Sequence, residues 1–292
     1  MPNYKPNIVL STKEYNVVGT RPIRHDGTSK VTGWARYGAD INLPGLLHGK
    51  ILRSPHPHAR IKSIDTSRAL AMPGVKAIVT SEELPQPSGK IADLGEGAMV
   101  NPKFLSNNVL ASDKVLYKGH AVAAVAAESP HLAEEALSSI LVEYELLPSV
   151  LDVLDAMKDD APLLHERLET FAVLGIQPGG LRSDQDTRRG SNISNHFVLE
   201  TGEPTEGFQK AHLIVEREYR TTTVHQGYIE PHAATALWNA DDTLTIWCSS
   251  QGHFGIRDNV AMVLGLPVSK IKVIPMEIGG GFGGKLGIYL EP

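Results

Sequence analysis

Residues 278–285 read Ile-Gly-Gly-Gly-Phe-Gly-Gly-Lys, so five of these eight residues are glycine. Glycine has no Cβ, and it therefore adopts positive φ angles readily and lets another group lie directly against the backbone. A simple turn does not require so many glycines. The run predicts a loop whose backbone N–H groups face an anionic ligand, with Phe282 as the one bulky side chain fixed within it.

Short nucleotide-binding patterns also match this glycine loop. Gly279, Gly284 and Lys285 fit the P-loop pattern G-x-x-x-x-G-K, but Leu286 stands where that pattern needs a Ser or Thr for magnesium. The glycines also fit G-x-G-x-x-G, yet residues 286–292 are too short for the helix and acidic residue of a dinucleotide site. The loop therefore has two alternative interpretations. It could belong to a P-loop nucleotide binder, which is a remote alternative, or it could be a tight connection that binds no ligand.

Composition limits the class of protein. The chain has 292 residues, of which 41% are hydrophobic and 21% charged, which is enough to bury a sizeable core in about two domains. A net charge of −5 argues against a nucleic-acid partner. Cys248 is the single cysteine, so the chain has no internal disulfide and no multi-cysteine metal site. We expect a cytoplasmic protein, because no apolar run is long enough to span a membrane and no secretory signal is visible.

The first half of the chain has the pattern of one α+β domain. After an N-terminal arm over residues 1–20, short strand-like and helix-like segments alternate through residues 21–150. One clear helix signal is Ser129 followed by Pro130, because serine caps a helix and proline is favoured at its first position. Residues 151–200 form a connecting segment that includes a polar stretch, which we expect to be a loop.

A second domain is expected over residues 201–292. Residues 213–221 alternate between apolar and polar side chains and predict a strand, and residues 244–248 and 271–276 predict two more. Gln251 lies at the turn between the second of these strands and a helix that ends at Gly265. If the last two strands are neighbours, the Gln251 turn and the glycine loop open at the same end of a sheet, where ligands commonly bind.

Several histidines are close enough in sequence to be considered as ligands of a metal ion. His56 and His58 are close in sequence, as are His225, Glu230 and His232. Neither group has the H-E-x-x-H spacing of a helical zinc site, so we interpret them as ordinary surface or core residues. No Ser-His-Asp or Cys-His set can be recognised, and we interpret Cys248 as a small buried apolar residue.

Two of these features, taken together, resemble a known family. Ser249-Ser250-Gln251, followed at a similar spacing by Gly280-Gly281-Phe282-Gly283-Gly284-Lys285, resembles the cofactor signatures of the large subunit of the xanthine dehydrogenase/aldehyde oxidase family of molybdenum hydroxylases. The resemblance runs from about Thr20 to Pro292. Further segments that fit it in the expected order are residues 33–40, 53–59, 117–123, 218–220 and 230–234.

The resemblance implies an α+β chain in which an α/β-hammerhead domain is followed by the first part of a mixed α/β molybdopterin-binding domain. Gln251 would hydrogen-bond an oxygen ligand of molybdenum, a task that suits a neutral amide beside an anionic cofactor. Because the pterin itself holds the metal, no protein residue is expected to be a metal ligand. The residues expected to bind the cofactor are Gln251, Gly252, Gly280, Gly281, Phe282 and Gly283.

The resemblance also implies cofactors and partners. The cofactor would be molybdenum-molybdopterin, expected in its cytosine dinucleotide form. The reaction would hydroxylate an aldehyde, an N-heterocycle or an aromatic substrate with oxygen from water. Electrons would pass to a [2Fe–2S] small subunit and an FAD-binding medium subunit.

Two departures from the family shape these expectations. Leu286 occupies a position in the substrate pocket where xanthine-oxidising members commonly have an acidic residue, so a purine substrate is disfavoured. The family's large subunits are also much longer. We expect this chain to be the N-terminal portion of such a subunit, inactive alone, with the catalytic base glutamate on the C-terminal part. The alternative is a non-catalytic assembly or scaffold piece of such a complex.

Overall fold

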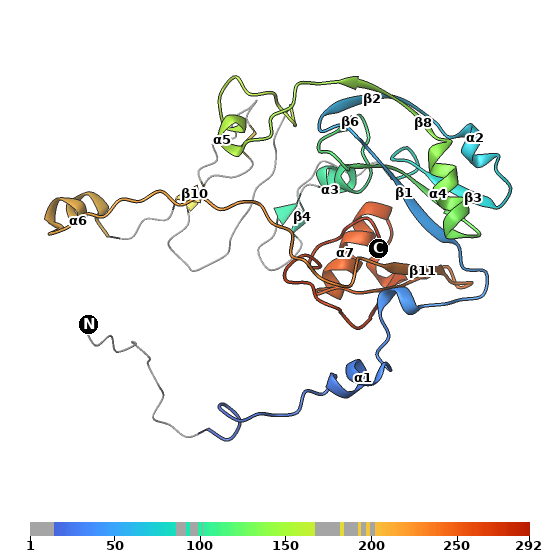
Figure 1. The fold of residues 1–292 in the computed structure, drawn as a ribbon, viewed down its shortest axis with the longest axis horizontal. Coiled ribbons are helices and arrows are strands. Elements are labelled where there is room, and N and C mark those ends of the chain that lie inside the picture. The colour runs from blue at the N-terminus through green and yellow to red at the C-terminus, as the bar shows by residue number, and fades with distance from the viewer. Residues whose placement is uncertain are drawn as a thin grey trace. The chain divides into compact units, whose positions relative to one another are not determined.

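The structure is a computed structural model that describes residues 15–85, 92–93, 99–100, 102–166, 182–183, 192–193, 197–198 and 202–292. The chain divides into two units, Met1–Arg36 and Tyr37–Pro292. In the described part of the first unit, helix α1 (Gly27–Thr32) has no buried residue and ends at Gly33 in the left-handed conformation with φ of 79° (Figure 1).

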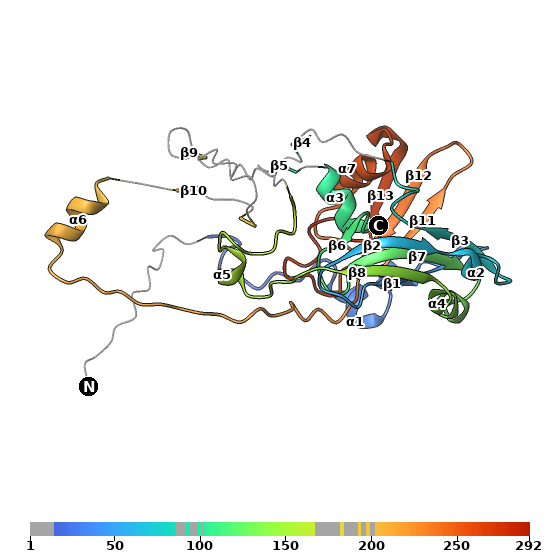
Figure 2. The same ribbon diagram turned by 90° about the horizontal axis from the view of Figure 1, so that it is seen from above.

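The second unit contains two three-stranded sheets in its first half, with strand orders β1-β7-β3 and β6-β2-β8 (Figure 2). All pairs in these two sheets are antiparallel. A short helical turn, η1 (Gly38–Asp40), precedes the first strand. The strands are β1 (His48–Arg53), β2 (Ala59–Asp65), β3 (Val75–Val79), β6 (Lys114–Val115), β7 (Ala121–Ala127) and β8 (Leu141–Leu146).

Strand β7 is the central strand of the β1-β7-β3 sheet. It consists only of alanine and valine, whose small side chains let other elements pack closely on it. Helix α4 (Pro130–Ser138) packs on β1 and β7, and small residues of α4 and β7 share one buried core. The predicted cap is confirmed, since the Oγ of Ser129 accepts a hydrogen bond from the N–H of Leu132 and Pro130 is the first helical residue. The other helices of this half are α2 (Ser67–Leu70) and α3 (Pro102–Val109).

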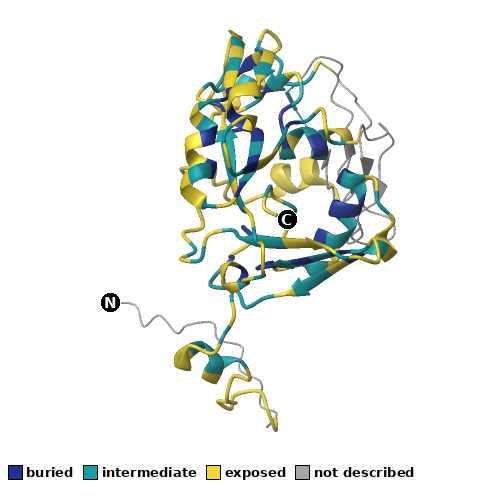
Figure 3. Ribbon diagram, turned by 90° about the vertical axis from the view of Figure 1, so that its right-hand side faces the viewer, coloured by how far each residue is buried: buried dark blue, intermediate teal, exposed yellow. Residues whose placement is uncertain are grey.

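The second half is built on a mixed sheet of order β11-β12-β13. Strand β11 (Ala234–Trp238) pairs antiparallel with β12 (Leu244–Cys248), and β12 pairs parallel with β13 (Ile271–Pro275). The crossover between the parallel strands is helix α7 (His253–Leu264), which ends at Gly265 with φ of 63°, as predicted. The core between this sheet and α7 includes Cys248, which is buried as predicted. Figure 3 shows buried residues within the sheets and helices of the chain.

The remaining elements are short. They are β4 (Ala92–Asp93), β5 (Met99–Val100), α5 (Val153–Ala156), β9 (Arg182–Ser183), β10 (Phe197–Val198), α6 (Pro204–Lys210) and η2 (Val268–Lys270). Most of the polar loop that we predicted within residues 151–200 lies outside the described residues. None of the helices in the described ranges is long and apolar enough to cross a membrane.

The prediction of a strand at residues 213–221 is wrong. These residues form no strand, and every residue from 202 to 227 is exposed. Alternation of apolar and polar side chains reports only that a segment suits a half-buried surface, whereas a strand also needs a neighbour to hydrogen-bond. In the described part of the chain, no backbone hydrogen bond links residues 213–221 to another segment.

The apolar core of the second half should be sensitive to loss of volume at Ile246, whose side chain is fully buried in the central strand β12. We expect Ile246→Ala to lower the free energy of unfolding by about 2–4 kcal/mol in urea denaturation, because the residual cavity adds to the lost burial. Lys272→Ala, at an exposed position of β13, should change the free energy of unfolding by less than about 0.5 kcal/mol. Equal effects of the two substitutions would contradict this account of the core.

Candidate functional site

The Gln251 turn and the glycine loop leave the sheet at the same edge. In the parallel pair of β12 and β13, Cys248 lies opposite Pro275, so both strands end together. The N–H of Met276 then donates to the carbonyl of Cys248 at 3.2 Å, which extends the pairing by one bond. The predicted adjacency of the two turns is therefore confirmed, and it brings segments about thirty positions apart in sequence into contact.

Gln251 is bound to the glycine loop through one end of its amide. Its Oε1 accepts hydrogen bonds from the N–H groups of Gly283 at 3.0 Å and Lys285 at 3.2 Å. The backbone N–H of Gln251 donates to the carbonyl of Lys285 at 2.9 Å. Two donors saturate the amide oxygen, whereas the Nε2 amino group has no partner within the described part of the chain. Gln251 is exposed, so this amino group is available to a ligand.

The backbone of the loop adopts conformations that explain part of its glycine content. Gly280 and Gly283 have φ angles of 99° and 88°. Phe282 also lies in the left-handed region, with φ of 49°, at a cost of roughly 1–2 kcal/mol for a residue with a Cβ. Phe282 is 72% exposed, so apolar burial does not compensate for that strain.

Gly279 and Gly281 do not have positive φ angles, and they are explained instead by side chains that lie directly against their backbone. A Cβ on Gly281 would lie 2.5 Å from Oε1 of Gln251, and one on Gly279 would lie 2.5 Å from the Cβ of Glu230. The loop therefore needs bare backbone to let Gln251 and Glu230 in. It is a packed junction between three segments, and its glycines do more than reverse the direction of the chain.

Glu230 is the third component of this junction. Its Oε2 accepts from the N–H of Gly279 at 2.7 Å and from Nζ of Lys285 at 2.8 Å, and its Oε1 accepts from Oγ of Ser249 at 2.5 Å. Burial opposes ionisation of this carboxyl group, but the hydrogen bonds from Lys285, Ser249 and Gly279 outweigh burial and lower the pKa of Glu230. One carboxylate thus links both ends of the glycine loop to the turn that carries Gln251.

The side chain of Lys285 reaches into the interior of the chain, to Glu230. Its side chain is fully buried, pairs with Glu230 and lies over the ring of Tyr228, with 5.0 Å from Nζ to the ring centre. Residues 286–292 form no helix. A P-loop lysine must reach the phosphates of its ligand, so these contacts contradict the P-loop alternative.

The histidine groups considered for a metal are engaged in packing. The rings of His225 and His232 lie 4.9 Å and 5.3 Å from the ring of Tyr228, and burial lowers the pKa of His232. In the first half, Nδ1 of His58 lies 2.6 Å from the carbonyl of Pro148. Among the described residues, no three side chains of the metal-binding types come together.

Three successive N–H groups in the loop remain available as donors. Within the described residues, those of Gly280, Gly281 and Phe282 have no hydrogen-bond partner, although Gly281 is buried. Gly252 lies at the start of α7, and a Cβ there would lie 3.5 Å from the carbonyl oxygen of Leu286. Leu286 itself is 57% exposed. The structure thus gathers all the predicted site residues at one edge of the sheet.

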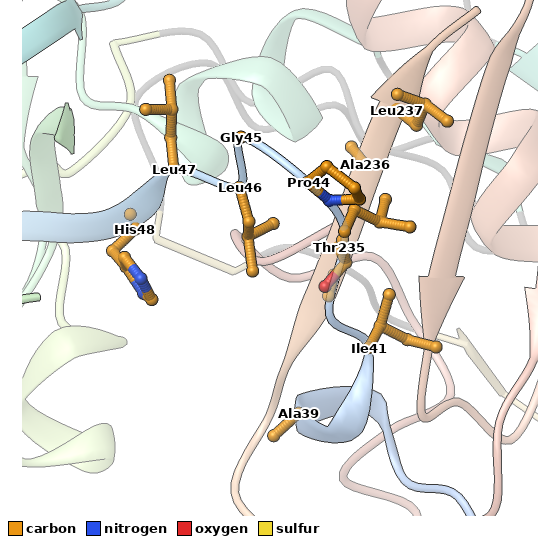
Figure 4. A pocket seen from close by; sticks show the side chains of 13 residues that line it. Ala39, Ile41, Pro44, Gly45, Leu46, Leu47, His48, Thr235, Ala236 and Leu237 are labelled. Atoms are coloured by element: carbon orange, nitrogen blue, oxygen red, sulfur yellow. The ribbon is translucent and has the colours of Figure 1, made fainter. Parts of the chain in front are cut away.

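A cavity of about 470 Å³ lies elsewhere, beside strand β11 (Figure 4). None of the predicted site residues lines it. Its walls are residues 39, 41, 43–49 and 234–237.

Sequence reasoning missed the part that three residues play in the junction. Glu230 was considered as a possible metal ligand and Lys285 as a possible phosphate-binding residue, and both lie in segments that carry the family resemblance, but nothing in the sequence indicates that they pair with each other. Tyr228 was not singled out. The Glu-Pro-His-Ala-Ala segment beginning at Glu230, which carries part of the family resemblance, was the available signal.

Comparison with known proteins supports the class defined by this fold and site. A family model described as the aldehyde oxidase and xanthine dehydrogenase a/b hammerhead domain matches residues 32–148. A second, described as a molybdopterin cofactor-binding domain, matches residues 186–292. The predicted fold class, a hammerhead domain followed by part of a molybdopterin-binding domain, is confirmed.

Relatives and solved structures agree with this class. The nicotinate dehydrogenase large molybdopterin subunit of Eubacterium barkeri is 33% identical over 96% of this chain and 58% of that protein. The carbon monoxide dehydrogenase large chain of Afipia carboxidovorans is 34% identical over 98% of this chain and 34% of its own length. The structure of carbon monoxide dehydrogenase from Oligotropha carboxidovorans matches with a TM-score of 0.72 and 33% identity, covering 94% of this chain and 32% of that one.

The chain therefore belongs to the xanthine dehydrogenase/aldehyde oxidase family of molybdenum hydroxylases, and it is similar to their large subunits. It spans between about a third and 58% of the length of these relatives.

The contact between Gly281 and Gln251 can be tested by adding a single methyl group. Gly281→Ala should displace the Gln251 side chain, because the new Cβ would lie 2.5 Å from Oε1. We expect a change in the NMR signals of the Gln251 amide group and faster hydrogen exchange at the N–H of Gly283 and Lys285. Gly287→Ala is the matched control, since nothing lies within 4 Å of a Cβ there. Unchanged Gln251 signals in Gly281→Ala would contradict the described packing.

The carboxylate of Glu230 should give this region a stability that depends on pH. Its pKa in the folded chain is lower than the ordinary value of 4.5, so its contribution is present at neutral pH and disappears as the pH falls through the folded pKa. We expect Glu230→Gln to lower the melting temperature at about pH 7, and the difference from the wild type to shrink as the pH falls from the ordinary pKa of 4.5 through the lower pKa of the folded chain. A difference that grew on acidification would contradict the lowered pKa.

Proposed function

We propose that this chain contributes one wall of a molybdopterin site in a molybdenum hydroxylase of the xanthine dehydrogenase/aldehyde oxidase type. The observation that carries the proposal is the junction of Gln251 with the glycine loop at one edge of the β11-β12-β13 sheet. When bound, the cofactor would supply the molybdenum chemistry that hydroxylates a carbon of the substrate with oxygen from water.

The residues present fit an anionic cofactor that brings its own metal ligands. Within the described residues, the N–H groups of Gly280, Gly281 and Phe282 and the amino group of Gln251 make no hydrogen bond, and all of these donors are neutral. Such donors stabilise negative charge without adding a side chain that could compete for the metal. The side chain of Lys285, a cation beside the loop, is already neutralised by Glu230.

Gln251 would act as a hydrogen-bond donor to the cofactor. Because its Oε1 is held by the N–H groups of Gly283 and Lys285, only its amino group can face the ligand. A side-chain amide can both donate and accept hydrogen bonds, and with its oxygen occupied the geometry favours donation to the ligand. Gly252 and Phe282 would frame the same side of the site, through backbone and an exposed ring respectively.

The proposed substrate is an aldehyde, an N-heterocycle other than a purine, or an aromatic compound. The support is Leu286, which is exposed beside Gly252 and offers no charge or hydrogen bond to a polar ring. The relatives include a nicotinate dehydrogenase and a carbon monoxide dehydrogenase, so the family as a whole accepts small substrates of different kinds.

We further propose that the chain works in a heteromeric complex in the cytoplasm. The partners would be a polypeptide corresponding to the rest of the relatives' large subunits, a [2Fe–2S] subunit and an FAD subunit. Support comes from relatives described as large subunits or large chains, which are longer than this chain. The cofactor form would be the cytosine dinucleotide, and the single cysteine suits a reducing compartment.

The proposal predicts that Gln251→Glu impairs the purified native complex. A carboxylate would still accept from Gly283 and Lys285, but it would place a second oxygen, bearing negative charge, where the amino group faces an anionic cofactor. We expect about a hundredfold lower kcat, as for loss of one transition-state donor, together with a lower molybdenum content. Gln209→Glu, the same change on the exposed helix α6, is the control and should leave both unchanged.

Molybdenum and pterin content of the wild-type complex, measured by elemental analysis and by fluorescence of the oxidised pterin, tests the proposal independently of any variant. A complex with stoichiometric partners but without molybdenum would overturn it and would favour the scaffold alternative.

A further inference from the structure

Lys285 connects the buried ion pair to Gln251 through its own backbone. Its N–H donates to Oε1 of Gln251 at 3.2 Å, and its carbonyl accepts from the N–H of Gln251 at 2.9 Å and from Oγ of Ser250 at 3.2 Å. The side chain of the same residue ends in the ion pair with Glu230. A displacement of Lys285 would therefore move the groups that orient the Gln251 amide.

The ion pair holds Lys285 in one place because its ammonium group cannot reach water. The side chains of Lys285 and Glu230 are 0% and 12% exposed, with 2.8 Å between Nζ and Oε2. A buried charge that loses its partner is strongly disfavoured, so the pair persists as a unit. Within the described residues, Glu230 is the only carboxylate within 4.0 Å of this Nζ.

Glu230 fixes the other end of the same loop. Its Oε2 also accepts from the N–H of Gly279, so the first and last residues of the segment 279–285 are attached to one carboxylate oxygen. Its Oε1 binds Ser249, two residues before Gln251. Gln251 is thus attached to Glu230 by two routes, one through Ser249 and one through Lys285.

We propose that Glu230 and Lys285 are positioning residues that hold the amide of Gln251 in the orientation in which its amino group faces the cofactor. This inference rests on the proposed function for its consequence in the complex, but the geometry it concerns belongs to this chain alone. Because the two charges cancel, the pair acts through geometry and adds no attraction for an anionic ligand.

Hydrogen exchange followed by NMR on this chain separates positioning from general stability. Lys285→Met keeps the backbone N–H of residue 285 and removes the charge. We expect exchange at the N–H of Gly283 and of residue 285 to accelerate about tenfold more than exchange in the buried strand β12, where faster exchange reports only the loss of global stability. Equal acceleration in β12 would show a purely structural role and would overturn the inference.

If the single variant does not fold, the double variant Glu230→Gln/Lys285→Met tests whether the ion pair positions the Gln251 amide. It leaves no unpaired buried charge, so global stability should recover at least in part. We expect the exchange of Gly283 and residue 285 to remain fast and the Gln251 amide signals to remain shifted. Recovery of the wild-type exchange and signals would overturn the inference. Lys270→Met, which breaks the exposed pair of Lys270 with Asp242, is the control and should change neither readout.

Failure of the proposed function can be recognised separately. In the purified complex, Lys285→Met should lower kcat more than it raises KM, because Gln251 is misdirected while the substrate pocket persists. A wild-type complex that contains no molybdenum refutes the cofactor role, yet the exchange pattern in the chain still confirms or refutes the positioning of Gln251.

Discussion

The parallel pairing of β12 with β13 is the constraint on which the site depends. Antiparallel neighbours can be joined by a short turn, whereas parallel ones need a crossover, here provided by α7. That crossover places the ends of both strands at one edge, with Cys248 opposite Pro275. The turn that carries Gln251 and the glycine loop therefore both begin at this edge of the sheet. Their contact follows from the topology of the sheet.

Polar contacts convert this proximity into a defined geometry. Backbone groups alone would leave a loop rich in glycine free to sample many conformations, since glycine loses more entropy on folding than any other residue. Here the Gln251 amide oxygen and the Glu230 carboxylate each receive more than one donor from the loop. The same glycines that make the loop flexible in the unfolded chain are those whose missing Cβ atoms admit these two side chains.

The sequence predicted those parts of the molecule that local patterns determine. Helix α7 with its glycine end, the proline start of α4 and the buried strand β12 follow from periodicity and capping, which depend on neighbouring residues. The contact of Gln251 with the glycine loop was expected from the resemblance and from strand adjacency. The pairing of Glu230 with Lys285 was not predicted, because residues 55 positions apart meet only through the tertiary fold.

Residues 213–221 have the alternating sequence of a strand and are exposed along their whole length. Such a segment can pair with any available edge, including the same segment of another copy. The purified chain is therefore expected to form concentration-dependent oligomers whose interface reflects the preparation and not the biological assembly. A measured molecular mass above 31.6 kDa for the isolated chain would say little about the stoichiometry of the native complex.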